Sequence, residues 1–183
     1  ELDVDVPSLG MHSAERGIAE LADDQVRGAR LATELLIRLG HAEIVHIAGP
    51  QDWIEAESRM QGYLRALSDA DLPTRPPILG DWSADFGYRA AIELSRRLDF
   101  TAVFAANDAM AMGLLHGFRD VGIDVPGHVS VVGFDDIPLS AHAWPPLTTV
   151  HQNFAGLGER AVRAVLRATR AGDPEPADDA PDV

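Results

Sequence analysis

Carboxylate, amide, guanidinium and indole side chains follow four short apolar runs of this sequence. In chain order these side chains are Trp53, Arg59, Trp82, Asn107, Asp135 and Asp136. Carboxylate and amide oxygens accept hydrogen bonds from hydroxyl groups, a guanidinium donates from a fixed fork, and an indole face covers C–H surface. This combination of residue types predicts a site for a small ligand with several hydroxyl groups, such as a sugar.

The segments around these residues predict the elements that would position them. The apolar runs indicate buried strands at residues 43–49, 77–80, 101–105 and 129–132. Helical spacing of apolar residues indicates helices at residues 54–69, 85–98 and 108–121, the second of which has Tyr88, Ile92 and Leu94 as core candidates. Strands that alternate with helices predict an α/β fold with a parallel sheet. The carboxyl ends of parallel strands lie along one edge of a sheet, so we expect the polar and aromatic side chains to share one rim.

Further elements are predicted toward the two ends of the chain. Amphipathic helices are expected at residues 26–39 and 154–171, and each is followed by a glycine, a common helix-ending residue. Residues 7–11 and 17–21 could each form a short strand. The tail at residues 173–183 is rich in Pro and Asp and is typical of a loop or a disordered segment.

Each candidate side chain also has a purely structural interpretation as a helix cap, a turn residue or an ordinary packing or surface residue. The caps would be Ser83, Asn107 or Asp108, the turn residues Asp81 and Asp136, and the packing or surface residues Trp53, Arg59 and Trp82. The joint position of these residues at one predicted rim favours a binding site.

Composition narrows the class of protein. The 183 residues have a formal net charge of −14, and their 15 basic residues are all arginine, with no lysine and no cysteine. A strongly acidic chain is a poor partner for the phosphates of duplex DNA. The absence of lysine and cysteine excludes Schiff-base and thiolate chemistry and the lysine of a phosphate-binding loop. The seven histidines have no metal-ligand spacing and no nucleophile-elbow or zinc-protease motif occurs, so we expect no enzyme, no metal and no cofactor.

The sequence also bears on location. It contains no apolar run long enough to cross a membrane. It opens on acidic residues rather than on a basic and then apolar leader, and the lack of cysteine fits a reducing compartment. We therefore expect a cytoplasmic protein without a membrane partner.

Four segments resemble the effector-binding core of the LacI/GalR family of bacterial transcription regulators. They are LATELLIRLGHAEIVHIAGP, GDWSADFGYRA, TAVFAANDAMAMG and VSVVGFDDIPLSAHAWPPLTTVHQNFAGLG, in the family's order and with near-uniform spacing. The resemblance implies a periplasmic-binding-protein-like fold, in which two α/β lobes hold a small ligand, usually a sugar, between them. Residues 1–40 and 152–172 would form part of the first lobe, residues 42–150 the second lobe and residues 173–183 a tail, with a lobe-crossing strand at residues 148–151.

The resemblance also assigns roles to site residues. The predicted ligand-binding set is Asp24, Trp53, Arg59, Trp82, Asn107, Asp135, Gln152 and Phe154. Arg59 would donate to ligand hydroxyls and Asp135 would accept from them, beside the amide of Asn107 and the aromatic wall of Trp82. The members that would reach the ligand from the first lobe are Asp24, Gln152 and Phe154.

The predicted function is effector sensing for a LacI-type transcriptional regulator or repressor. An effector, expected to be a carbohydrate, would favour one arrangement of the lobes. This allosteric change would alter operator affinity through an N-terminal helix-turn-helix module that the sequence does not contain, and a homodimer is expected. One alternative is a sugar-binding protein of a transport system, which shares the fold. Another is a metal-dependent phosphatase or kinase that uses Asp135 and Asp136.

Overall fold

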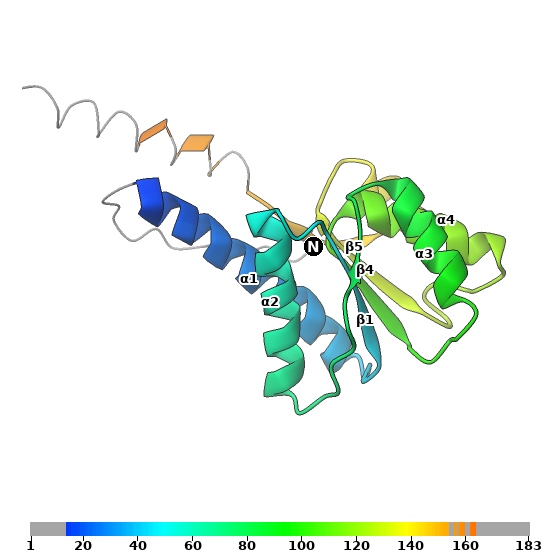
Figure 1. Ribbon diagram of the computed structural model, residues 1–183. Coiled ribbons are helices and arrows are strands. Elements are labelled where there is room, and N and C mark those ends of the chain that lie inside the picture. The colour runs from blue at the N-terminus through cyan, green and yellow to red at the C-terminus, as the bar shows by residue number, and fades with distance from the viewer. Residues whose placement is uncertain (1–13, 154–155, 157, 160–161, 164–183) are drawn as a thin grey trace, which may run out of the picture.

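A five-stranded parallel sheet with the order β2-β1-β3-β4-β5 forms the centre of the structure, a computed structural model. Residues 14–153, 156, 158–159 and 162–163 are described, with side chains from Asp24 onward. The elements are α1 (Ala14–Arg38), β1 (Ile44–Ala48), α2 (Ile54–Asp69), β2 (Ile78–Leu79), α3 (Ala84–Leu94), β3 (Ala102–Ala105), α4 (Asp108–Asp120), β4 (Ser130–Asp135), the short 3-10 helix η1 (Ser140–His142) and β5 (Thr148–His151). Helices α1 and α2 cover one face of the sheet, and α3 and α4 cover the other (Figure 1). The predicted α/β fold with flanking helices is confirmed.

The strands are apolar on both sides because helices cover both faces of the sheet. On β1, Val45 and Ile47 point into the core beneath α3 and α4, whereas Ile44 points into the core beneath α1 and α2. This alternation follows from strand geometry, in which successive side chains point to opposite faces. Continuous apolar runs thus identify covered strands, and the four predicted runs correspond to β1, β2, β3 and β4.

Helix α1 is longer than the sequence pattern predicted. It begins at Ala14 rather than at residue 26, so residues 17–21 are helical and the strand predicted there is wrong. The helix is rich in Ala, Leu, Arg and Glu, and this high helix propensity outweighs the short apolar groups that suggested a strand. Its predicted end is confirmed, because Gly40 has a φ of 93° and its N–H donates to the carbonyl oxygen of Ile37 at 2.9 Å. The other candidate strand, residues 7–11, lies outside the described residues.

The described part of α1 packs onto the same sheet as the other helices. Ala29 and Leu36 are fully buried in the core that α1 and α2 share with the strands. The approach is close, since a Cβ at Gly28 would lie 2.8 Å from ring atoms of Phe134 on β4. This part of α1 therefore packs in one layered unit with the sheet, whereas the prediction had placed residues 1–40 in a first lobe.

Helix α3 ends at Leu94, about one turn earlier than predicted. Of its three core candidates only Leu94 is buried, while Tyr88 and Ile92 are half-buried. The reason is close packing against α4, where a Cβ at Gly87 would clash with the backbone of Met110. Small residues therefore face the neighbouring helix, and larger side chains lie at the flank.

Strands β4 and β5 extend the sheet beyond the predicted runs. Strand β4 continues to Asp135, and β5 pairs with it in parallel, with Val132 opposite Thr148 and Asp135 opposite His151. The segment predicted to cross between lobes is thus the edge strand of this sheet.

The predicted C-terminal helix is described in part. Of residues 154–171, residues 156, 158–159 and 162–163 are helical, and the others lie outside the described residues, as does the tail at residues 173–183. Across the described part of the chain, no helix is both long and apolar enough to span a membrane.

One histidine lies inside the core beneath α2. His46 on β1 is fully buried, and its ring is stacked with Tyr63 at 4.9 Å and with Phe104 at 4.7 Å between ring centroids. Its Nδ1–H donates to the carbonyl oxygen of Phe104 at 2.9 Å, and Nε2 has no hydrogen-bond partner among the described residues. Burial, aided by the positive charge of Arg59, lowers the pKa of His46 to about 4. The imidazole is therefore neutral at physiological pH.

Replacing His46 with phenylalanine should remove an acid sensitivity of the fold. The pKa of His46 is about 4 in the folded state against an ordinary value of 6.5, so between these pH values the unfolded state binds a proton that the folded state lacks. Relative to His46→Phe, the parent should lose roughly 3 kcal/mol of unfolding free energy as the pH falls through this range. Urea unfolding of both proteins at neutral pH and at about pH 4 measures the difference. A gap in unfolding free energy that is the same at both pH values would contradict the prediction.

Candidate functional site

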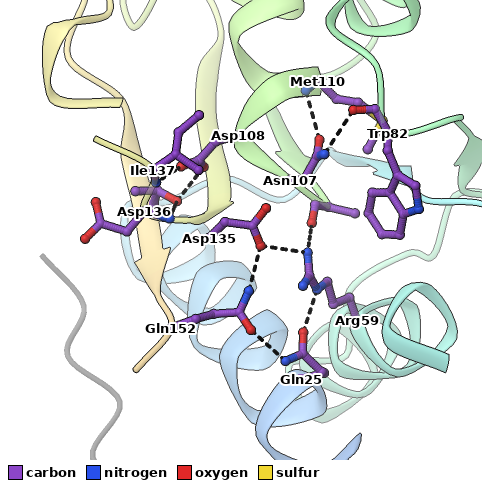
Figure 2. Close-up of polar contacts among 12 residues, drawn as sticks. Gln25, Arg59, Trp82, Asn107, Asp108, Met110, Asp135, Asp136, Ile137 and Gln152 are labelled. Carbon is purple, nitrogen blue, oxygen red and sulfur yellow. Dashed lines mark hydrogen bonds and ion pairs between the residues drawn. The ribbon is translucent and has the colours of Figure 1, made fainter. Parts of the chain in front are cut away.

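Four side chains form a closed ring of polar contacts at the carboxyl edge of the sheet (Figure 2). Arg59 Nε donates to Gln25 Oε1 at 2.7 Å, and Gln25 Nε2 donates to Gln152 Oε1 at 2.8 Å. Gln152 Nε2 donates to Asp135 Oδ1 at 2.7 Å, and the same oxygen lies 3.2 Å from Arg59 Nη1. The ring joins α1, α2, the end of β4 and the residue that follows β5.

The guanidinium of Arg59 is enclosed by aromatic rings and backbone. It lies 3.9 Å from the ring centroid of Phe134 and 5.6 Å from that of Trp82, and it donates to the carbonyl oxygen of Ala106. Burial lowers the pKa of Arg59, and the nearby carboxylate of Asp135 opposes this shift. A buried charge is stable only with its hydrogen-bond and ion-pair partners in place, so Arg59 is a fixed part of the site.

Asp135 is the titrating acceptor of the ring. Burial raises its pKa to about 6, the Arg59 guanidinium opposes the rise, and the negative charge of Asp108 adds to it. The backbone φ of Asp135 is 117°, a conformation that is rare outside glycine and costs on the order of 1–3 kcal/mol. Its side chain is 24% exposed, so a ligand can reach the carboxylate from solvent.

Asn107 positions both a helix and an indole. Its Oδ1 accepts from the N–H of Met110 at 2.9 Å and caps α4, and its Nδ2 donates to the carbonyl oxygen of Trp82 at 3.0 Å. Trp82 has a φ of 69°, and its ring lies over Gly49, where a Cβ would clash with the indole. Asn107 therefore caps the helix, as one interpretation of the sequence had it, and also holds the aromatic wall of the site.

Asp108 is a buried acceptor rather than the helix cap. It is fully buried, and its Oδ2 accepts from the Ser140 hydroxyl at 2.5 Å and from the Ile137 N–H at 3.0 Å. Its Oδ1 accepts from the Thr149 hydroxyl at 2.5 Å. The capping role that the sequence allowed for either residue belongs to Asn107. Through these hydrogen bonds Asp108 instead links α4 to β5 and to the loop after β4.

Asp136 points away from Asp135 and forms no metal pair with it (Figure 2). Its Oδ2 lies 2.8 Å from His151 Nδ1, and its N–H donates to the Thr149 hydroxyl at 3.3 Å. Its φ of 54° agrees with the predicted turn role. Among the residues that the structure describes, no group of three or more His, Asp or Glu side chains could hold a metal ion.

Asp81 and Ser83 have the structural roles that the sequence suggested. The Ser83 hydroxyl accepts from the N–H of Phe86 at 3.1 Å and caps α3. Asp81 Oδ1 accepts from the N–H of Ser83 at 2.9 Å and so fixes the turn that precedes the helix. These two residues shape the segment that carries Trp82.

Most of the predicted ligand-binding residues meet at this edge of the sheet. Those in the ring or beside it are Trp53, Arg59, Trp82, Asn107, Asp135 and Gln152. Trp53 is the outermost, with its ring centroid 6.1 Å from that of Trp82. Phe154 lies outside the described residues.

Gln25 is the ring member that sequence reasoning missed. Asp24, the predicted acidic contact, is half-buried one position earlier on α1. Gln25 is 4% exposed and shares the buried face of α1 with Ala29, Ala32 and Leu36 at helical spacing. A polar residue on an otherwise apolar helix face is the signal that could have identified it.

Comparison with known proteins agrees with this fold. The periplasmic binding protein-like domain family matches residues 33–181. The HTH-type transcriptional regulator CelR of Thermobifida fusca is 38% identical over 165 residues, which cover 88% of this chain and 48% of the relative. The chain therefore spans about half the length of this relative.

Two solved structures are similar in both sequence and shape. The complex of the transcriptional regulator CelR with cellobiose is 39% identical with a TM-score of 0.77, and the match covers 83% of this chain and 47% of that chain. The Lac repressor dimer bound to operator and the anti-inducer ONPF is 34% identical with a TM-score of 0.77, and the match covers 80% of this chain and 52% of that chain. The chain thus belongs to the periplasmic binding protein-like domain family, as an effector-binding domain of the LacI/GalR type.

Proposed function

We propose that this chain senses a carbohydrate effector for a LacI-type transcriptional regulator. The observation that carries the proposal is the ring of Gln25, Arg59, Asp135 and Gln152 beside the indole of Trp82. The ring offers guanidinium donors with carboxylate and amide acceptors, and these groups with an indole recognise hydroxyl groups and C–H surface. The similarity to CelR, a regulator solved with cellobiose, supports the same assignment.

The ring suggests how an effector would act. Its polar atoms bond to one another, so a ligand with hydroxyl groups must replace some of these contacts, such as that between Gln152 and Asp135. Gln25 lies on α1 and Gln152 follows β5, so replacing their contacts changes how these segments are held. A ligand that makes better contacts in one arrangement of the two proposed lobes shifts the equilibrium toward it.

The shift would reach operator DNA through a helix-turn-helix module of the full-length protein. The net charge of −14 makes this chain itself a poor partner for DNA phosphates. A coupling of about 1–3 kcal/mol between effector and operator is typical of such switches. We place this activity in the cytoplasm, where operator DNA is found.

The alternatives have less support. A sugar-binding protein of a transport system shares the fold, but the similar proteins described above are transcription regulators. A metal-dependent phosphatase or kinase would need Asp135 and Asp136 to act together, and Asp136 is paired with His151 instead. A regulatory role without catalysis fits the site best.

We also propose that the protein forms a homodimer through an apolar surface beside α4. Trp144 is 81% exposed and Leu139 is 58% exposed, and both line a surface hollow with Leu115 and Arg119. Exposed apolar patches of this kind mark protein contacts. The full-length protein should sediment as a dimer and Trp144→Glu as a monomer. A dimer that survives this substitution would show that another surface is used.

Calorimetric titration of the full-length protein with cellobiose and lactose tests the proposed function. Because the pKa of Asp135 is about 6, the carboxylate takes up a proton as the pH falls through this value and accepts hydrogen bonds less well. Affinity should therefore fall below pH 6 by up to about tenfold per pH unit. Asp135→Asn should bind weakly, without this pH dependence. Parent-like binding by Asp135→Asn would contradict the assignment of the site.

A further inference from the structure

We propose that the site accepts a carbohydrate of at least two pyranose units, with the second unit lying against Trp53. The inference rests on the proposed function, because it concerns the extent of the same site. Four observations carry it: the line of groups that leads out from the ring, the exposure of Trp53, the lack of a capping role for its side chain, and the carboxylates beside it.

Trp53 extends the aromatic wall from the buried ring toward solvent. The Arg59 guanidinium lies 5.6 Å from the centroid of Trp82, and Trp53 meets Trp82 edge-on at 6.1 Å with an interplanar angle of 77°. Exposure rises along this line, from 5% at Arg59 through the half-buried Trp82 to 52% at Trp53. The three groups form a continuous surface with a charged inner end and an apolar outer end.

The fold itself does not account for an indole at position 53. Trp53 is the N-cap residue of α2, where Ser, Thr, Asp and Asn are preferred, and its side chain makes no capping hydrogen bond. About half of this large apolar side chain is left in water. Tryptophan offers a wide, rigid contact surface at small conformational entropy cost, which makes it favourable at a recognition surface.

The neighbours of Trp53 indicate a sugar rather than a purely apolar occupant. Asp52 precedes it, and Glu55 follows in the first turn of α2. Burial lowers the pKa of Arg59, and the negative charge of Glu55, like that of Asp135, opposes this shift. Carboxylates accept hydrogen bonds from hydroxyls while an indole covers C–H surface, and a pyranose ring presents both.

The arrangement of the guanidinium and the two indoles determines how many pyranose units the site can contact. Trp82 lies beside both the Arg59 guanidinium and Trp53, at 5.6 Å and 6.1 Å from the ring centroid of Trp82. A single pyranose that bonds to Arg59 and Asp135 lies against Trp82 and leaves Trp53 uncovered. The outer indole is therefore available to a second unit, and a disaccharide should bind more tightly than its component monosaccharide.

Calorimetry of the full-length protein compares glucose with cellobiose and maltose, and galactose with lactose. A disaccharide should bind at least about tenfold more tightly than its monosaccharide, which corresponds to about 1.4 kcal/mol. Trp53→Ala should remove most of this advantage and weaken monosaccharide binding by a much smaller factor, and Trp53→Phe should keep part of the advantage. Leu98→Ala is the matched control, because Leu98 is an apolar side chain of similar exposure, 51%, in the segment before β3 at the opposite edge of the sheet. This control should bind all five sugars like the parent.

The outcomes separate this inference from the proposed function. If Trp53→Ala weakens monosaccharides and disaccharides by the same factor, or if disaccharides bind no better than monosaccharides, the second subsite is overturned and carbohydrate sensing stands. If none of the five sugars binds to the parent, carbohydrate sensing is contradicted and the subsite with it.

Discussion

Replacing Arg59 with alanine should abolish effector binding and also weaken the fold. The guanidinium is the ring's only cationic donor, and removing one partner of a buried, hydrogen-bonded charge pair costs about 2–5 kcal/mol of binding, so affinity should fall by at least about 30-fold. Arg59 is 5% exposed, and its loss leaves Gln25 Oε1 without its donor and Asp135 without its cationic partner. We expect the free energy of unfolding to drop by about 2–4 kcal/mol for this reason. Calorimetric titration and urea unfolding measure the two effects separately.

Two further variants give this prediction its controls. Arg65 lies on the same helix but is exposed, so Arg65→Ala should change neither binding nor stability. Arg59→Lys keeps the charge but loses the planar fork that reaches Gln25, Asp135 and the backbone, so its affinity should lie between those of the parent and Arg59→Ala. If Arg59→Ala bound the effector as tightly as the parent, Arg59 would not contribute to the binding site.

Replacing Asp108 with alanine should cause the largest loss of stability at a residue outside the ring. The substitution leaves the Ile137 N–H and the hydroxyls of Ser140 and Thr149 without their shared acceptor, in a fully buried position. Unsatisfied buried donors and the lost charge-assisted bonds together should lower the free energy of unfolding by roughly 3–5 kcal/mol. Urea unfolding followed by circular dichroism measures the loss.

Asn107→Ala is the matched control for Asp108, because the two residues are adjacent and the sequence allowed either to be the cap. Loss of the cap bond to Met110 should cost about 1 kcal/mol, clearly less than the loss at Asp108. Equal losses at the two positions would mean that the buried acceptor role of Asp108 contributes no more than a cap.

The layered fold could be predicted because its signals are local. A covered strand such as β3 is a short apolar run, and a helix such as α4 repeats its buried residues at helical spacing. Parallel strands follow from the alternation of the two patterns, and the shared rim follows from the parallel sheet. Arg59 and Asp135 could thus be placed at one rim from the sequence pattern, whereas Gln152 was assigned to the site only through the resemblance to the LacI/GalR family.

The contacts within the site could not be predicted, because they join residues far apart in the chain. Nothing near Gln25 indicates that its amide meets Gln152, which lies 127 positions further along the chain. Asp108 does not cap the helix because its carboxylate accepts from Ser140 and Thr149. These partners are distant in sequence, so local propensity could not decide between Asn107 and Asp108 as the cap. The start of α1 was missed because the short apolar group at residues 17–21 fits a strand as well as a helix.

The pKa shifts of His46 and Asp135 have a joint consequence for how the protein responds to mild acid. Between pH 4 and 6.5 the unfolded state binds a proton at His46 that the folded state excludes, since the folded pKa of His46 is about 4. Over nearly the same interval the folded state binds a proton at Asp135 that the unfolded state lacks, because the folded pKa is about 6 against an ordinary value of 3.8. The first shift weakens the fold as the pH falls and the second strengthens it, so the two largely cancel. In mildly acidic solution the domain should therefore stay folded while the charge of its proposed effector acceptor changes, and acidity would act on sensing rather than on folding.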